Sequence, residues 1–415
     1  MSVAERPLSE LASADTVDNV LVFVSDSTRF DALPDRVAER GVTAEAIAPS
    51  TWTASSLPSL TTGRYPTTHG VWGFDTRLAR TPRLLSEPEN VGFDAGTIWT
   101  HVESAEKPPL WMNRLTDETT LDELEPPFVH VVHDKGGHAP YGQSFDDWEV
   151  SSEFFDAYAD RPDDIAEWYE RGVSESVDRF LALVDRLDER GILEDTLAVF
   201  TSDHGELLGE PSRGGIYGHS APLVPELARV PVAFVGAGLP AGERYDHLLS
   251  GVDLAPTALS AYGIEPGRGF DGVDAWRSSP PTDRWPRSEI WSQYTFEPLD
   301  RTMPLYAATS VWSDEGGVVF HHGSTAIRTA YGLGGYLLFE GTAAAIRANM
   351  TPRKLLALAR TFGPRTVTYG SVSRPMLDAR SGLPTEFARS PDREPTDDAE
   401  GHLDKEQLRK LGYIE

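Results

Sequence analysis

The stretch Thr196-Leu197-Ala198-Val199-Phe200-Thr201-Ser202-Asp203-His204-Gly205-Glu206 decides the fold. Residues 196–201 form an apolar run of the length of a buried strand, and Asp203, His204 and Gly205 follow it as a turn. Open α/β sheets place their functional groups at the carboxyl ends of such strands. Asp, His and Gly are also ordinary turn residues, so this stretch taken alone is better explained by a strand that ends in a hydrogen-bonded turn.

Two further segments repeat this pattern of an apolar strand followed by a carboxylate. Residues 19–25 run into Asp26, and residues 128–133 run into Asp134, with His138 four residues later across a Gly-Gly turn. Three buried strands that end in Asp predict one shared cluster. Carboxylate and imidazole together suit a divalent ion such as zinc or manganese, and the absence of cysteine from the chain excludes a thiolate site.

Composition limits the class of protein. With 415 residues, 40% of them hydrophobic, the chain is long enough for one large α/β domain with an appendage. Its 65 acidic and 37 basic residues give a formal net charge of -28, which is typical of surfaces that stay soluble in a high-salt cytoplasm. No basic run is present to neutralise phosphates, so nucleic acid is not an expected partner.

Hydropathy gives an expectation for location. Residues 1–18 contain no apolar segment of the kind found in signal peptides, and no run of about twenty apolar residues occurs elsewhere in the chain. We therefore expect no membrane association and a soluble cytoplasmic enzyme. Oligomeric state is left open.

The remaining elements follow from periodicity and turn residues. Apolar residues at helical spacing predict a long helix over about 162–190, with Gly191 as its stop. Further predicted elements are strands over 42–49, 92–99 and 230–235, a helix over 254–262 capped by Asp253, short strands over 317–320, 325–331 and 335–339, and a helix over 352–361. The expected organisation is a leader (1–18), a catalytic domain (19–296), a C-terminal α+β subdomain (297–388), and a linker and tail (389–415).

Thr53 is the candidate nucleophile. Residues 50–63 form a hydroxyl-rich turn that leads into a predicted helix, whose free N–H groups and dipole favour an anion at its start. Ser and Thr are also the preferred N-cap residues, and the turn by itself favours the interpretation of Thr53 as a cap.

These motifs together resemble the sulfatase-like branch of the alkaline phosphatase superfamily. The resemblance begins at residues 187–206 and covers residues 19 to about 275 and the last few residues. The other motifs, in the order expected for the family, are residues 19–26 with Arg29, residues 59–66 with His69-Gly70, residues 138–141, 229–231, 253–257 and 408–413.

The resemblance implies a fold and a set of roles. It implies an alkaline-phosphatase-like three-layer sandwich with a mainly parallel central sheet and a smaller C-terminal antiparallel sheet. It also implies that Asp26, Asp203 and His204 hold a divalent metal (zinc, manganese or calcium), that Thr53 is the nucleophile, and that His138 contacts the substrate or leaving group. Asp134, His138 and His219 match a second metal site, with a purely structural role as an equal alternative. Arg29 and His69 are expected to brace the fold, and His133 to be a buried core histidine.

One departure from the family bears on the substrate. True sulfatases carry a Cys/Ser-x-Pro-x-Arg signature that is converted to formylglycine, whereas this chain reads Thr53-Ala54-Ser55-Ser56-Leu57. The resemblance therefore implies a metal-dependent hydrolase of a small-molecule or glycan ester that acts through an unmodified Thr53, with phosphoester favoured over sulfate. The alternatives are a catalytically silent binding protein with the same fold, and a transferase that passes the same group to an alcohol.

Overall fold

The computed structural model describes residues 6–99, 102–144, 147–148, 151–296, 301–338 and 342–388. The predicted linker and tail, including the motif at residues 408–413, lie outside the described residues.

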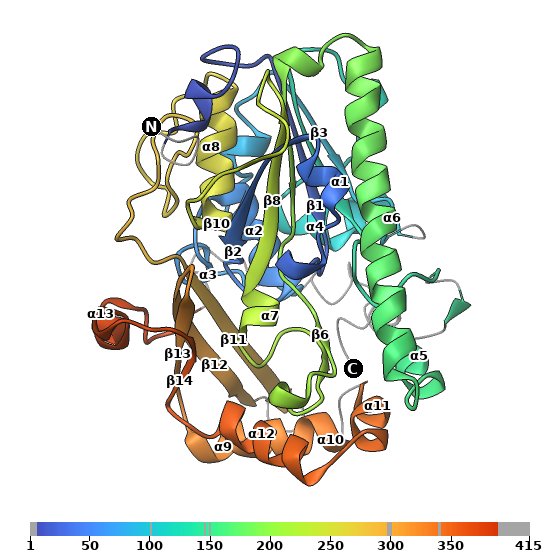
Figure 1. The fold of residues 1–415 in the computed structure, drawn as a ribbon, viewed down its shortest axis with the longest axis vertical. Helices are drawn as coiled ribbons and strands as arrows, with labels where there is room; N and C mark the ends of the chain where they lie inside the picture. Colours follow the sequence, from blue (N-terminus) through green and yellow to red (C-terminus); the bar gives the residue numbers. More distant parts are fainter. Residues whose placement is uncertain are drawn as a thin grey trace.

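A mixed sheet of eight strands forms the centre of the molecule (Figure 1). Its order is β10-β2-β8-β5-β1-β4-β3, with the short β9 paired to β2. Only β8 runs antiparallel to its neighbours; all other pairings are parallel. The strands are β1 (Asn19–Ser25), β2 (Gly41–Ile47), β3 (Asn90–Asp94), β4 (Phe128–Asp134), β5 (Thr196–Thr201), β8 (Arg229–Gly236), β9 (Glu243–Arg244) and β10 (Leu249–Ser250).

Helices cover both faces of this sheet. Side chains alternate along β1, so Val22 packs in a core with Leu57 of α2 (Thr53–Thr62) and Ala255 of α8 (Leu254–Ala261). On the opposite face, Phe23 packs against Phe180 of α6 (Pro162–Glu189). Figure 1 shows α6 along one side of the sheet and α8 on the other. The predicted three-layer sandwich with a mainly parallel sheet is confirmed.

A smaller antiparallel sheet lies below the main one in Figure 1, with the order β11-β12-β13-β14. Its strands are β11 (Arg287–Phe296), β12 (Arg301–Ser313), β13 (Gly316–His321) and β14 (Thr366–Gly370). Because β11 pairs along its whole length with β12, this sheet begins ten residues before the predicted subdomain boundary at 297. A shared core that includes Tyr141, Tyr306 and Phe362 joins it to the main body.

Two predicted strands of this region are wrong. The structure places α9 (Thr325–Ala330) and α10 (Tyr336–Leu338) where these strands were expected, because a short apolar run fits a helix as well as a strand. The remaining helices are α1 (Asp35–Ala38), α3 (Pro66–His69), α4 (Pro108–Met112), α5 (Ser151–Ala157), α7 (Pro225–Ala228), α11 (Ala343–Ala348), α12 (Pro352–Phe362) and α13 (Arg374–Asp378), and a small hairpin pairs β6 (Leu207–Leu208) with β7 (Tyr217–Gly218).

Two other local predictions need correction. The strand expected over 92–99 is β3, which ends at Asp94. Asp253 makes no side-chain cap at α8, because its carboxylate binds Arg284 and the Ser250 backbone N–H instead. Within the described residues, no helix combines the length and apolar character needed to cross a bilayer.

Candidate active site

Three adjacent strands bring the predicted carboxylates to one edge of the sheet. β1 lies between β5 and β4, with Val24 opposite Thr201 and Ser25 opposite Asp134. Asp26 directly follows β1, and Asp203-His204 follow β5. Parallel strands in register end at the same edge, which is why residues far apart in sequence meet there.

Asp26, Asp203 and His204 form a completely buried cluster. His204 Nε2 lies 3.8 Å from Asp26 Oδ1 and 3.6 Å from Asp203 Oδ2, and one candidate ligand atom from each residue lies within 4.8 Å of the other two. Asp203 Oδ2 has no hydrogen-bond partner among the described residues. Two buried carboxylates need a compensating positive charge, so the residues present fit a divalent cation of the kind that O and N ligands bind.

Hydrogen bonds fix the orientation of these side chains. His204 Nδ1–H donates to the Gly205 carbonyl at 2.9 Å, which leaves the Nε2 lone pair directed at the cluster. The His204 backbone N–H donates to Asp203 Oδ1 at 3.0 Å, and the Ser27 hydroxyl donates to Asp26 Oδ1 at 2.8 Å. The cluster is therefore held in place by its own chain turns.

Thr53 is the first residue of α2 and its hydroxyl points at this cluster. Thr53 Oγ1 lies 3.0 Å from His204 Nε2 and 3.4 Å from Asp26 Oδ2. The N-cap position belongs to Trp52, which makes no side-chain cap, so the hydroxyl of Thr53 is not used for capping. Ser56 ties the same helix to the site by donating to the Asp203 carbonyl at 2.5 Å.

His133 also faces the cluster, contrary to its expected role as a core histidine. It is the residue before Asp134 on β4 and is completely buried. Its Nε2 lies 3.4 Å from Asp26 Oδ2 and 4.0 Å from Asp203 Oδ2. Burial alone would lower the pKa of His133, but the charges of these two carboxylates outweigh it and raise the pKa. The raised pKa favours the protonated form of His133, whose positive charge would lie beside the two carboxylates.

Asp134 does not join the cluster. Its Oδ2 accepts a hydrogen bond of 2.7 Å from Arg179 Nε of α6, and its Oδ1 accepts one of 2.9 Å from Arg179 Nη2. The Gly136 N–H and the Ser176 hydroxyl also donate to Oδ1. A carboxylate with this set of donors has the surroundings of a structural ion pair rather than of a metal ligand.

Of the three residues predicted for a second metal site, His138 and His219 lie close to the cluster and Asp134 does not. The ring of His219 has its centroid 5.2 Å from that of His138 and 4.5 Å from that of His204. His138 Nδ1–H donates to the Ala139 carbonyl at 2.6 Å, so Nε2 is its basic nitrogen. Burial lowers the pKa of His138 and keeps that nitrogen unprotonated near neutral pH.

Glu206 is a buried carboxylate of the site that the sequence did not single out. It accepts hydrogen bonds from the Tyr141 hydroxyl at 2.7 Å and from His219 Nδ1–H at 3.0 Å. Burial raises the pKa of Glu206 to about 7, against the opposing charge of His138. Its position directly after Asp203-His204-Gly205 was a usable signal, but the partners Tyr141 and His219 come from separate loops.

The cluster holds Asp26 in its charged form. Burial would raise the pKa of this carboxyl, but His138, His133 and His204 outweigh burial and hold the pKa well below its ordinary value. A permanently ionised carboxylate is what a divalent ligand site requires.

Arg29 and His69 support the surroundings of the site. Arg29 Nη2 pairs with Asp31 at 2.7 Å and Arg29 Nη1 with Glu210 at 2.5 Å. His69 is hydrogen-bonded through both ring nitrogens, to Ser59 Oγ at 2.8 Å and to the Val71 N–H at 3.1 Å. Burial lowers the pKa of His69 to about 3, so it is neutral at physiological pH. Both residues therefore have the bracing contacts expected of them.

Comparisons with known proteins agree with this architecture. The family model named Sulfatase matches residues 107–264. The low-salt glycan biosynthesis sulfotransferase of Haloferax volcanii is 44% identical over 412 residues, which cover 98% of this chain and 99% of that protein. A multifunctional alkaline phosphatase superfamily protein of Trinickia caryophylli is 34% identical over 123 residues, which cover 28% of this chain and 23% of that protein.

Solved structures show the same fold. The phosphonate monoester hydrolase of Agrobacterium radiobacter superposes with a TM-score of 0.56 at 15% identity, over 73% of this chain and 87% of that one. From the ordered motifs, the sheet with its buried Asp-Asp-His cluster and the match along nearly the whole chain, we conclude that this protein belongs to the sulfatase-like family of the alkaline phosphatase superfamily.

Proposed function

We propose that this protein transfers a sulfuryl group from a sulfate ester to a sugar hydroxyl of a glycan, through a covalent ester on Thr53. The observation that carries the proposal is the position of Thr53 Oγ1, 3.0 Å from His204 Nε2 and 3.4 Å from Asp26 Oδ2 at the start of α2. The full-length similarity to a sulfotransferase supports sulfate over phosphate and transfer over hydrolysis, both of which differ from the expectation based on sequence alone.

Asp26, Asp203 and His204 would hold the divalent ion that the family implies. When bound, the ion would stabilise negative charge on the transferring group and lower the pKa of a hydroxyl beside it. The chain's own contribution is position, because a hydroxyl held rigidly next to the sulfur atom needs little further ordering to react.

In the first half of the reaction, Thr53 Oγ1 forms a bond to sulfur and the bond between sulfur and the donor oxygen breaks. The proton that Thr53 Oγ1 releases as this bond forms is taken up by the departing donor oxygen, so this half of the reaction balances without protonating the three residues that would hold the ion. In the second half, a sugar hydroxyl oxygen bonds to the same sulfur and Thr53 Oγ1 leaves and regains a proton. We assign the acceptor's proton to His138 Nε2, since burial lowers the pKa of His138 and leaves this nitrogen unprotonated and able to accept a proton.

The test uses wild type, Thr53→Ala and Thr53→Ser in molar KCl, with an aryl sulfate as donor and an oligosaccharide as acceptor. Thr116→Ala serves as a matched control, because it removes an exposed threonine hydroxyl far along the chain from the cluster. We expect Thr53→Ala to lose roughly a thousandfold or more in rate, as removal of a nucleophile does. Thr53→Ser and the control variant should retain turnover.

Mass spectrometry gives an independent result. A quenched wild-type reaction should carry one sulfuryl group on the peptide that contains Thr53, and the Thr53→Ala variant should not. Inorganic sulfate as the only product, in the presence of acceptor, would assign hydrolysis instead. Turnover of an aryl phosphate alone would replace sulfate by phosphate, and full activity of Thr53→Ala would refute the covalent route.

A further inference from the structure

A pocket with a volume of about 660 Å³ opens at the end of α2 that lies opposite Thr53. It is formed by the last turn of α2, by α3, by residues 78–87 and by the loop at 268–270. Thr53 and Thr62 are the two ends of this helix, and ten helical residues span roughly 15 Å. The pocket is therefore separate from the catalytic cluster.

The lining of this pocket is basic, in a chain whose net charge is -28. It contains four arginines (Arg64, Arg80, Arg83 and Arg268) and one carboxylate, Glu87. Arg83 is already neutralised, because its Nε pairs with Glu87 at 2.6 Å. The other three arginines form no ion pair within the described part of the chain, although Arg64 Nε donates to the Gly269 carbonyl at 2.7 Å.

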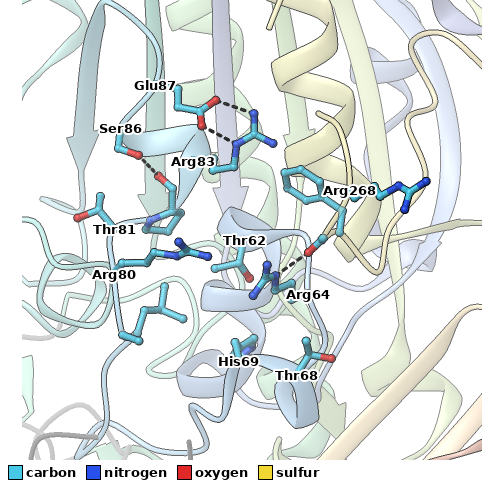
Figure 2. A pocket seen from close by; sticks show the side chains of 15 residues that line it. Thr62, Arg64, Thr68, His69, Arg80, Thr81, Arg83, Ser86, Glu87 and Arg268 are labelled. Carbon is cyan, nitrogen blue, oxygen red and sulfur yellow. Dashed lines mark hydrogen bonds and ion pairs between the residues drawn. The ribbon is translucent and has the colours of Figure 1, made fainter. Parts of the chain in front are cut away.

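Figure 2 shows how these side chains are directed. The guanidinium groups of Arg64 and Arg80 point toward each other across the pocket, and that of Arg268 points away. Acidic residues outnumber basic ones by 65 to 37, so a surface arginine in this chain has many possible carboxylate partners. Two like charges that face each other without a carboxylate between them repel, unless an anion binds between them.

The other lining groups suit a saccharide. The threonine and serine hydroxyls of the wall (Thr62, Thr68, Thr81 and Ser86) can accept hydrogen bonds from sugar hydroxyls, and Phe270 supplies an apolar ring. Guanidinium groups bind the carboxylate and sulfate groups of sugars in bidentate fashion.

We propose that this pocket binds an anionic saccharide unit of the glycan, with its carboxylate or sulfate group held between Arg64 and Arg80. The anionic part of the ligand follows from the charges of the pocket. Its saccharide part rests on the proposed function.

The test measures binding by calorimetry with the full chain, loaded with metal, at low and at molar KCl. The probes are a short oligogalacturonide, a sulfated oligosaccharide, a neutral maltooligosaccharide of matching length, and inorganic sulfate alone. The two anionic oligosaccharides separate a uronate ligand from a sulfated one. We expect at least one of them to bind more tightly than the neutral oligosaccharide and than sulfate, and more weakly as salt rises.

Variants at Arg64 and Arg80 test whether these two arginines bind the anionic oligosaccharide. The double variant Arg64→Ala with Arg80→Ala should bind roughly tenfold or more weakly, because it removes charge-assisted hydrogen bonds. Arg80→Glu, at an exposed position that tolerates substitution, should weaken binding on its own. Arg374→Ala is the matched control, since that side chain is 88% exposed and lies on α13. It should bind as wild type does.

Two comparisons test binding in the arginine pocket independently of the proposed function. Thr53→Ala should bind the anionic oligosaccharide as wild type does, and the arginine double variant should still turn over a small aryl sulfate. Binding without any turnover would overturn only the proposed function. Equal binding of neutral and anionic oligosaccharides, equal binding of inorganic sulfate, or unchanged binding in the arginine variants would overturn the pocket proposal.

Discussion

Asp134→Asn distinguishes a structural carboxylate from a metal ligand with almost no change in shape. In the structure, Asp134 Oδ1 accepts from Arg179 Nη2, Ser176 and the Gly136 N–H, and Oδ2 accepts from Arg179 Nε alone. An Asn side chain keeps its oxygen at the first position and places its NH₂ group against Arg179 Nε, where two donors then meet. One charge-assisted hydrogen bond is lost.

The expected cost is about 2 kcal/mol in the free energy of unfolding. A hydrogen bond to a charged group contributes roughly 1.5–3 kcal/mol. The Arg179 side chain is 40% exposed and can be rehydrated, which favours the lower half of that range. Urea denaturation in molar KCl measures this quantity, and elemental analysis of the same sample measures bound metal. We expect lower stability with unchanged metal content.

Two further variants serve as controls, one for an exposed ion pair and one for loss of the metal. Asp178→Asn alters an ion pair with Arg36 in which the Asp178 side chain is 67% exposed, and should cost less than about 1 kcal/mol. Asp203→Asn removes a completely buried carboxylate of the cluster and should release metal. If Asp134→Asn instead releases one ion and leaves the unfolding curve in place, the second metal site predicted from sequence is correct and our interpretation of the Arg179 pair is not.

Three other outcomes follow from the structure. Gly136 has a φ of +53° and its added Cβ would lie 2.3 Å from the Asp26 carbonyl oxygen, so Gly136→Ala should displace Asp26, cost about 2 kcal/mol or more in stability and weaken metal binding; Gly191→Ala, at φ +70° with open space around it, should cost only about 1 kcal/mol in urea unfolding. Burial lowers the pKa of His321 to about 4, so the unfolded chain takes up a proton first as pH falls below about 6.5. Stability should therefore fall by up to about 3 kcal/mol between pH 6.5 and 4, and His321→Gln should flatten this part of the stability–pH curve; an unchanged slope would contradict the assignment. Glu206→Gln removes the carboxylate that accepts from His219 Nδ1–H and should reduce turnover or metal affinity by about 10–100-fold in steady-state and metal-titration assays, whereas wild-type values in both would show that this carboxylate does not support the site.

The sequence predicted the main cluster because its signal is local. A buried strand of a parallel sheet is a continuous apolar run, and the residue after it lies at the functional edge. Asp26 follows such a run directly, and Asp203 and His204 follow another after one intervening residue, Ser202. No knowledge of partners was needed, so the prediction placed these residues together.

For Asp134 and His133, the local sequence did not predict which side chain reaches the cluster. Both lie at the end of β4, and adjacent strand residues point to opposite sides of the sheet. Which of the two reaches the cluster depends on the register of β4 with β1 and on the presence of Arg179, 45 residues further along the chain. Neither fact is encoded near residue 134. The short runs that became α9 and α10 fail for a related reason, because neighbouring elements choose between helix and strand.

In the proposed mechanism, release of the Thr53 ester to water or to a sugar would depend on which of them reaches the ester rather than on the nucleophile. Thr53 and the three candidate ligands are completely buried, whereas the His219 side chain beside them is 12% exposed. Burial slows the entry of water but does not select a sugar over it. A second attachment point for the glycan does select a sugar, because it raises the local concentration of the acceptor. We propose the arginine pocket, which lies about one helix length from Thr53, for this role.

If both proposals hold, a transferase would benefit from the arginine pocket, whereas a hydrolase of small esters would not. If the pocket holds the acceptor glycan, Arg64→Ala with Arg80→Ala should shift the products from sulfated glycan toward inorganic sulfate. The consumption of a small aryl sulfate donor should stay unchanged, because the arginines do not contact the Thr53 cluster. Chromatography of both products from one reaction measures this ratio. An unchanged ratio would mean that the acceptor is selected at the catalytic cluster itself.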